Sequence, residues 1–333
     1  MRLLRFFFVP VLALFAVGAA APQAVADAEA DLAKYSAFPH ADLESLGGGQ
    51  VLTARGPALG APRDLSVQAL YAIREPLQKT LEFHKQWDAT RHPELKVFVH
   101  RDLPAHPSPA DFNADAPGNS AVRALTEATL KLPDKGGLQM NDAEAKAFHG
   151  GDTKGSYPPA VRDFWSQLLH GRASKFADGS GIASQPEYDT PGGAIRPADE
   201  VTRLLKEQPN VLAMFRPIIG GGISGGSPYW EMFDVEGQAN FLLGAATSKT
   251  SGETAQILDL QYYASGGYYA YVTLYQMWAV TIGGKPATLV WRVDCLSSQD
   301  IADLSNVEKM GSGSAMMKEV LRTIQLTEKD AAR

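Results

Sequence analysis

Apolar and polar residues alternate in two short stretches near the start of the regular patterning. Residues 66–73 and 95–101 both place apolar side chains at every second position, which is the spacing of a strand. Pro76 lies between them, where the first turn of a helix tolerates proline, and the apolar positions after it have helical spacing. The pattern predicts a strand, a helix and a second strand.

The next stretch, residues 103–210, has helical spacings interrupted by many prolines and glycines. Asn141, followed three residues later by Glu144, is typical of a capping box at the start of a helix. Residues 177–196 are expected to form a loop. Helices are predicted to begin near Ala121, Asn141, Pro158 and Pro197. We therefore expect a mostly helical insertion.

From Val211 onward the pattern is that of strands separated by short turns that contain glycine. Connections this short imply antiparallel hairpins. The strand-like segments are 229–235, 239–247, 256–264, 268–280 and 287–295. Residues 306–324 then predict a long terminal helix, because apolar residues recur at three- and four-residue steps. This stripe contains Val307, Met310, Ser314, Met317, Leu321 and Ile324.

Together these elements predict an α+β fold, in which a curved antiparallel sheet packs on a long C-terminal helix and carries a mostly helical insertion at about 103–210. One domain is expected over residues 64–330. Residues 27–63 are rich in alanine, glycine and proline, which predicts a flexible N-terminal segment that serves as a tether or wraps around the domain.

Two neighbouring strands differ in the polarity of their faces. Residues 287–295 have one apolar face, while Thr288, Arg292 and Asp294 occupy the other, which predicts a face in contact with water. Residues 268–280 are apolar on both faces, so that strand has to be covered on both sides. The terminal helix would cover one side and the insertion the other.

Aromatic residues are dense in this half of the chain. Walls of aromatic rings with a few hydroxyl groups suit a pocket for an apolar or amphipathic molecule. The same rings would also simply fill a core, since Tyr, Phe and Trp favour strands. Glu231 shares a strand face with two of the rings, so it is the acid best placed to face a pocket. The candidate ligand-binding residues are Tyr229, Glu231, Phe233, Tyr263, Tyr269, Tyr271, Tyr275, Trp291 and Met317.

The first 26 residues have the three parts of a cleavable secretory signal. Arg2 and Arg5 precede an apolar run over residues 6–17, and Ala24-Val25-Ala26 forms a cleavage site. The apolar run is shorter than the roughly 20 residues that a membrane span needs, and no later segment is long and apolar enough. We expect a secreted or periplasmic protein without a membrane span after cleavage.

The charge and cysteine content narrow the classes of partner. The chain has 37 acidic and 31 basic residues and a net charge of −6, which argues against nucleic acid and anionic membrane surfaces as partners. Its single cysteine, Cys295, cannot form an internal disulfide, so stability has to come from a core.

The order of elements resembles the START-like, polyketide-cyclase-like helix-grip superfamily. The strand at 66–73, a helical segment, the run of antiparallel strands and the helix at 306–324 carry the resemblance, most clearly over residues 267–324. It implies a hydrophobic cavity between sheet and terminal helix that binds lipids, sterols or polyketides, and it transfers no catalytic residue. Residues 103–210 depart from the usual compact pattern of the superfamily.

Motifs for catalysis, cofactors and metals are weak. Residues 222–226 match G-x-S-x-G, but a strand follows instead of a helix, and no histidine occurs after His170, so a glycine-rich turn is the better interpretation. No phosphate-loop ending, H-E-x-x-H or C-x-x-C is present, and we predict neither cofactor nor metal. We interpret His100 as solvated, His84 as a core histidine, and Asp259 as a partner in surface ion pairs.

Three functional hypotheses follow. The first is an exported protein that binds a hydrophobic or amphipathic small molecule, lipid-like in character, between the sheet and the terminal helix. The second is a secreted enzyme that uses an acid such as Glu231 in the same pocket. The third is an interaction protein of the envelope whose insertion, residues 103–210, docks a partner.

Overall fold

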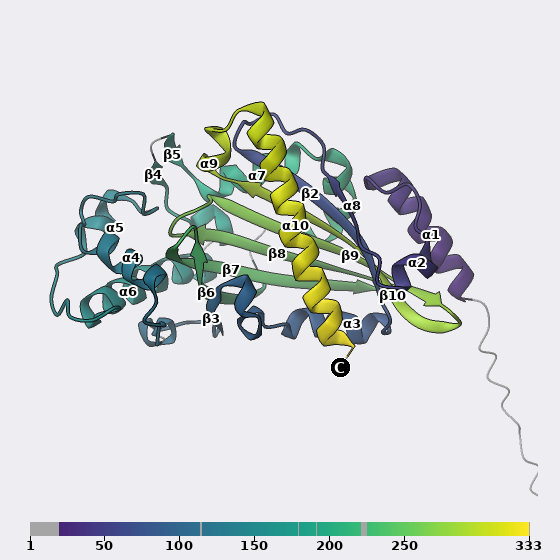
Figure 1. Cartoon of the computed structure of the whole chain (residues 1–333), viewed down its shortest axis with the longest axis horizontal. Coiled ribbons are helices and arrows are strands. Elements are labelled where there is room, and N and C mark those ends of the chain that lie inside the picture. Colours follow the sequence, from purple (N-terminus) through teal and green to yellow (C-terminus); the bar gives the residue numbers. More distant parts are fainter. Residues whose placement is uncertain (1–19, 114, 179, 191, 221–224, 333) are drawn as a thin grey trace, which may run out of the picture.

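An eight-stranded antiparallel sheet, in the order β1-β2-β10-β9-β8-β7-β6-β3, organises the chain (Figure 1). The computed structural model describes residues 20–113, 115–178, 180–190, 192–220 and 225–332. The strands of the sheet are β1 (Leu52–Arg55), β2 (Asp64–Ile73), β3 (Val97–Asp102), β6 (Ser227–Val235), β7 (Gln238–Ser251), β8 (Thr254–Ala264), β9 (Ala270–Ile282) and β10 (Lys285–Ser297). The predicted α+β class with an antiparallel sheet is confirmed.

The order of the sheet follows from its connections. Short turns join β6 to β10 in sequence, so these five strands form a meander of hairpins. The early strands occupy its two ends: β2 pairs with β10, and β3 pairs with β6. The edge strand β1, which pairs with β2, lies in the segment that the sequence predicted to be flexible.

The insertion between β3 and β6 is mainly helical. Its helices are α4 (Ser120–Thr129), α5 (Asp142–Lys146), α6 (Pro159–Asp178), α7 (Pro197–Lys206) and α8 (Pro209–Ile219). Two predictions there were wrong. The predicted loop at 177–196 contains a hairpin of β4 (Tyr188–Thr190) and β5 (Gly193–Ile195). The predicted change to strands at Val211 falls inside α8, where Val211 and Phe215, four residues apart, are buried together.

One face of the sheet supports the larger core. Helices α1, α4, α7 and α8 contact strands β7 to β10 there, and α6 adds Trp165, whose ring lies 4.9 Å from that of Phe241. Four of the five tryptophans belong to this core. They are Trp165, Trp230, Trp278 and Trp291, and each is at most 1% exposed. We call this side of the sheet the insertion face.

The N-terminal segment wraps around this core and is not a tether. Helix α1 (Ala20–Tyr35) buries Leu32, and Asp31 accepts a hydrogen bond from the Trp278 indole over 3.3 Å. Helix α2 (Leu43–Gly47) follows. The composition suggested flexibility, but the few large apolar residues in the segment are the ones that the core takes up. Residues 1–19 of the predicted signal lie outside the described residues.

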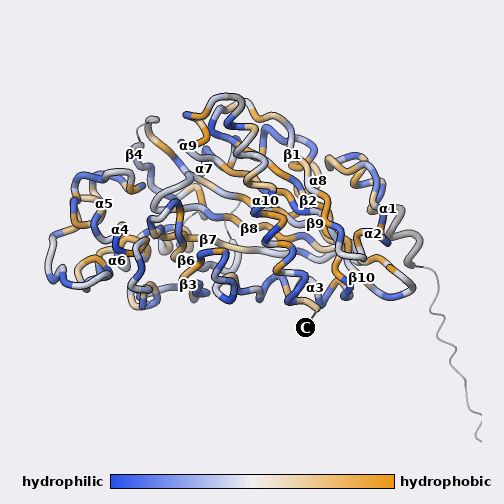
Figure 2. Tube along the Cα trace, in the orientation of Figure 1, coloured by the Kyte–Doolittle hydropathy of each residue, from blue (hydrophilic) through white to orange (hydrophobic). Residues whose placement is uncertain are grey.

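The opposite face carries two helices, α3 (Leu77–Gln86) and α10 (Asn306–Ala331), and α10 crosses it diagonally (Figure 1). Val320 and Ile324 of α10 pack on Val67 and Val290 in a second, smaller core. We call this side the α10 face. The predicted stripe on α10 is only partly correct, because Met310 is 60% exposed. Figure 2 shows apolar positions along the strands and a mixture along α10.

Short elements complete the chain. They are the 3-10 helices η1 (Ala89–Arg91), η2 (Pro93–Leu95), η3 (Pro109–Phe112) and η4 (Gly181–Ser184), and the short helix α9 (Gln299–Ala302). Within the described part of the chain, no helix combines the length and hydropathy needed to cross a bilayer.

Candidate functional site

A cavity of about 560 Å³ lies on the α10 face, between the sheet and α10. Strands β3 and β6 to β10 form its floor. Helix α3, the segment after it and one side of α10 form the rest of the wall. Its principal lining residues are Tyr71, His84, Trp87, His100, Tyr229, Glu231, Phe233, Asp259, Gln261, Tyr268, Tyr271, Thr273, Tyr275, Arg292, Glu319, Thr323 and Thr327.

Five of the nine predicted ligand-binding residues line this cavity. They are Tyr229, Glu231, Phe233, Tyr271 and Tyr275. The first three share one face of β6, and the other two share one face of β9, as strand alternation requires.

The other four predicted residues lie elsewhere. Trp291 faces the insertion side, where it packs on Phe215. Tyr263 donates a hydrogen bond to the Gln139 carbonyl over 3.0 Å, because a register shift between β7 and β8 precedes it. Tyr269 packs beside the β4–β5 hairpin, and Met317 packs against the smaller core. These placements correct the predicted set.

The predicted wet face of β10 is a second correction, because it is buried and contributes a charged pair to the cavity floor. Arg292 donates from Nε and Nη2 to the two carboxylate oxygens of Asp294, each over 2.7 Å. Tyr271 and Thr273 donate to Asp294 Oδ1 over 2.9 and 3.1 Å. Asp294 is fully buried and Arg292 is 8% exposed. The sequence shows only that these positions are polar. The pairing of β9 with β10 shows that their side chains form hydrogen bonds with one another.

Asp259 is the most distinctive ionisable group in the cavity. It faces the cavity from β8, and its Oδ1 accepts a hydrogen bond from the Tyr229 hydroxyl over 2.7 Å. Burial, together with the negative charge of Glu231, raises the pKa of Asp259 to about 6, although the Tyr229 hydrogen bond and the charges of Arg292 and His100 lower it. Interpreting Asp259 as part of a surface ion pair was therefore wrong. It makes no ion pair with any described residue.

Glu231 is held by a histidine from the neighbouring strand. Residues His100 and Glu231 are directly opposite in the β3–β6 pairing, and His100 Nδ1 lies 2.8 Å from Glu231 Oε1. Burial lowers the pKa of His100, but the Glu231 carboxylate outweighs it and raises the pKa above 6.5. His100 therefore lines the cavity, paired with Glu231, and is not a solvated side chain. Its ring lies 5.4 Å from that of Tyr229.

Aromatic rings form the wall beside these charges. The ring of Tyr268 lies 6.0 Å from that of Phe233 and 5.9 Å from that of Tyr271, and its hydroxyl donates to Gln261. Gly244 of β7 lies under the Tyr229 ring. A Cβ atom at residue 244 would overlap that ring, so only glycine lets it lie flat across the strand.

His84 closes the cavity on the α3 side. Its Nδ1 lies 2.9 Å from the Thr80 carbonyl, which only accepts, so Nδ1 carries the proton and Nε2 accepts from the Tyr71 hydroxyl over 3.0 Å. Burial lowers the pKa of His84 to about 4, and the nearby Arg292 lowers it further. His84 is therefore neutral at physiological pH.

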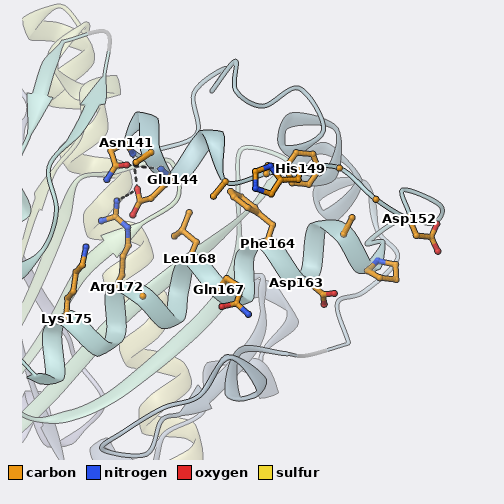
Figure 3. A pocket seen from close by; sticks show the side chains of 18 residues that line it. Asn141, Glu144, His149, Asp152, Asp163, Phe164, Gln167, Leu168, Arg172 and Lys175 are labelled. Atoms are coloured by element: carbon orange, nitrogen blue, oxygen red, sulfur yellow. Dashed lines mark hydrogen bonds and ion pairs between the residues drawn. The ribbon is translucent and has the colours of Figure 1, made fainter.

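A second hollow, of about 750 Å³, lies on the insertion between α5 and α6 (Figure 3). Phe164 and Leu168 of α6 form its apolar base, and an ion pair between Arg172 and Glu144, 2.7 Å apart, closes one end. The Arg172 guanidinium also lies 4.1 Å from the Tyr263 ring centre. Most of the residues lining this hollow are exposed, so it is a surface groove.

No protein family model matches the chain, and no curated protein sequence matches it. Its chemistry therefore has to be inferred from the cavity itself. Across the described ranges, no three His, Cys, Asp or Glu side chains are grouped so that they could hold a metal ion. Most of the G-x-S-x-G segment, residues 222–224, lies outside the described residues.

Proposed function

We propose that this chain is an exported protein that binds a small amphipathic molecule in the cavity of the α10 face. One observation carries the proposal: the cavity of about 560 Å³ combines an aromatic wall with a half-buried carboxyl group that has no ionic partner among the described residues. A volume of this size falls in the range of small-molecule sites, roughly 300–1,000 Å³.

The polar floor favours an amphipathic ligand over a purely apolar one. Asp259, Gln261 and Thr273 present polar atoms to the cavity from adjacent strands. A wholly apolar molecule would remove water from these groups without replacing their hydrogen bonds, which costs free energy. A ligand with one polar end and one apolar end would satisfy both the floor and the wall.

The connectivity of the sheet supports the proposed helix-grip relationship. The first strand of the predicted core unit, β2, pairs with the last strand, β10, and the helix that follows β10 crosses the same face as the cavity. The relationship itself remains a proposal, and the large insertion lies on the opposite face, where it leaves the cavity unobstructed.

Native mass spectrometry and organic extraction of the purified protein test the binding proposal. Ala246 lines the cavity directly opposite Asp259, so Ala246→Trp is expected to fill the cavity and abolish co-purified or added ligand. Thr250→Trp, at an exposed position on the same strand, is the matched control and should leave binding unchanged. Equal ligand retention by both variants would contradict the proposal.

The second hypothesis, an enzyme, gains one specific observation. Asp259 has a pKa near 6, where a carboxyl group exchanges protons readily at neutral pH. If the bound molecule is a substrate, incubation with the protein should convert it, with a rate that Asp259→Asn abolishes. Conversion at an unchanged rate in that variant would exclude Asp259 as the acid or base.

A further inference from the structure

Apart from the exposed Lys85, the charged side chains of the cavity form ion pairs, with one exception among the described residues. Glu231 is matched by His100, and Asp294 is matched by Arg292. Asp259 receives only the Tyr229 hydroxyl, a neutral donor, and among the described residues no cation lies within ion-pair distance of it. An ionised Asp259 therefore has no ion-pair partner among the described residues, and Arg292 and His100 act on its charge only from beyond ion-pair distance.

Aromatic rings surround the same carboxyl group. Burial raises the pKa of the Tyr229 and Tyr268 phenols, and the nearby charges of Asp259 and Glu231 raise both further. The Tyr268 ring also lies tilted between those of Phe233 and Tyr271, and all three residues line the same cavity as Asp259. The face of an aromatic ring carries negative partial charge and attracts a cation within about 6 Å.

We infer that the polar end of the ligand is an organic ammonium ion, seated against the Asp259 carboxylate and enclosed by the tyrosine rings. The inference rests on the proposed function and specifies its ligand class. A carboxylate or phosphate at this place would meet Asp259 and Glu231 as like charges. The nearest strong cation, Arg292, already holds Asp294 with two hydrogen bonds.

Every element around the cavity contributes to this balance of charge. The titratable and charged groups that face Asp259 or share its cavity are His100 and Asp102 of β3, Tyr229 and Glu231 of β6, Tyr268 before β9, Tyr271 and Tyr275 of β9, Arg292 and Asp294 of β10, Tyr71 of β2, His84 and Lys85 of α3, and Glu319 of α10. Lys85 and Glu319 are exposed, so solvent screens their charges. The inner groups leave Asp259 as the unmatched one.

Three probes with the same alkyl chain separate charge from hydrophobicity. We would measure binding of decyltrimethylammonium, decanol and decanoate by isothermal titration calorimetry at pH 7.5, below micellar concentrations. The ammonium probe is expected to bind at least about tenfold more tightly than decanol, a difference of about 1.4 kcal/mol, and decanoate is expected to bind most weakly. Equal binding of the three probes would overturn the inference.

Two variants locate the preference. Asp259→Asn keeps an oxygen that accepts the Tyr229 hydrogen bond, so it should bind decanol as the wild type does and lose the tenfold preference. Glu231→Gln should retain most of it. A preference that survives in Asp259→Asn, or that disappears equally in Glu231→Gln, would overturn the assignment to Asp259.

Acidification gives an independent readout in the unaltered protein. The ammonium preference should decline as the pH falls through about 6, because protonation removes the charge of Asp259. A preference independent of pH between 5 and 7.5 would contradict the inference. Ala246→Trp separates the two proposals. If Ala246→Trp abolishes binding of all three probes but the wild type binds the three equally well, only the ammonium inference fails. If Ala246→Trp abolishes binding of none of them, the proposed cavity function fails too.

Discussion

The two faces of the sheet differ in the chemistry of the side chains that they bury. On the insertion face, four tryptophans pack in a continuous apolar core covered by five helices. On the α10 face, a smaller core holds α3 and α10, and beside it ionisable groups and tyrosines surround a cavity. Burial of apolar area stabilises the fold mainly from one side. The other side can therefore hold groups that reduce stability and bind ligand.

Strand β10 shows the contrast between two neighbouring residues. The Trp291 ring packs on Phe215 in the insertion face, and its indole donates to Gln68 over 3.0 Å. The next residue, Arg292, faces the cavity, where it is buried with Asp294. Substitutions along this strand therefore distinguish the two faces.

The largest effect is expected on the insertion face. Trp291→Ala should lower the free energy of unfolding by about 3–5 kcal/mol, because it opens a large void in a packed core and removes one of the two hydrogen bonds that Gln68 Oε1 accepts. Urea denaturation followed by circular dichroism measures the change. Thr250→Ala, at an exposed position, serves as the control. A loss below about 1 kcal/mol would show that the insertion face is not the main source of stability.

Substitution of Arg292 tests whether the buried ion pair adds net stability to the α10 face, or whether its two charges only compensate one another. Arg292→Met should cost about 3 kcal/mol, because Asp294 is left buried without its cation. The double variant Arg292→Met, Asp294→Leu should recover to within about 1 kcal/mol of the wild type, since it removes both charges. Denaturation of both variants measures this. A double variant as unstable as the single one would show that the pair itself contributes stability.

Removal of the Asp259 charge is expected to raise the free energy of unfolding, in contrast to the two substitutions above. Its folded pKa of about 6 lies above the ordinary 3.8, so the folded protein binds the proton more tightly and loses stability as the pH rises from about 4 to about 6. Asp259→Asn should therefore stabilise the protein by about 1–2 kcal/mol at pH 7.5, after allowance for water in the cavity. Thermal unfolding across pH 4–8 should show the gain disappearing near pH 4. A destabilised variant at pH 7.5 would contradict this.

Removal of the Glu328 charge on α10 should also raise the free energy of unfolding, by a smaller amount. Burial raises its pKa from 4.5 to about 7, and its Oε1 has no hydrogen-bond partner among the described residues. The side chain is only half-buried, so Glu328→Gln should add less than about 1 kcal/mol at pH 8 and nothing at pH 4. The same pH series measures it. A gain that is equal at both pH values would point to packing instead of charge.

The sequence predicted the elements of the α10 face better than its chemistry. Alternation along 268–280 and 287–295 identified β9 and β10 and separated their faces, because strand geometry fixes side-chain direction every second residue. The polarity of Arg292 and Asp294 predicted a face in contact with water. That prediction was wrong because alternation along one strand does not reveal which elements cover it. The pairing with β9, which brings Tyr271 and Thr273 to Asp294, depends on tertiary structure.

Other errors have similarly specific causes. The shift of register between β7 and β8 carries Tyr263 to the insertion face, and such bulges leave no mark in a simple apolar pattern. Asp259 and His100 were missed as cavity residues because polar side chains on a strand suggest a face in contact with water. Their neighbours in space, Tyr229 and Glu231, come from another strand. The raised pKa of Asp259 therefore has no signal in the sequence.

The glycine beneath Tyr229 links the backbone of β7 to the recognition chemistry. Any side chain at residue 244 would displace the ring, and the hydroxyl that holds Asp259 would move with it. Residues 229 and 244 should therefore vary together in related sequences. A glycine at 244 with tyrosine at 229 would mark chains that keep this arrangement of ring and carboxyl group, while a larger residue at 244 would mark chains in which the ring has moved.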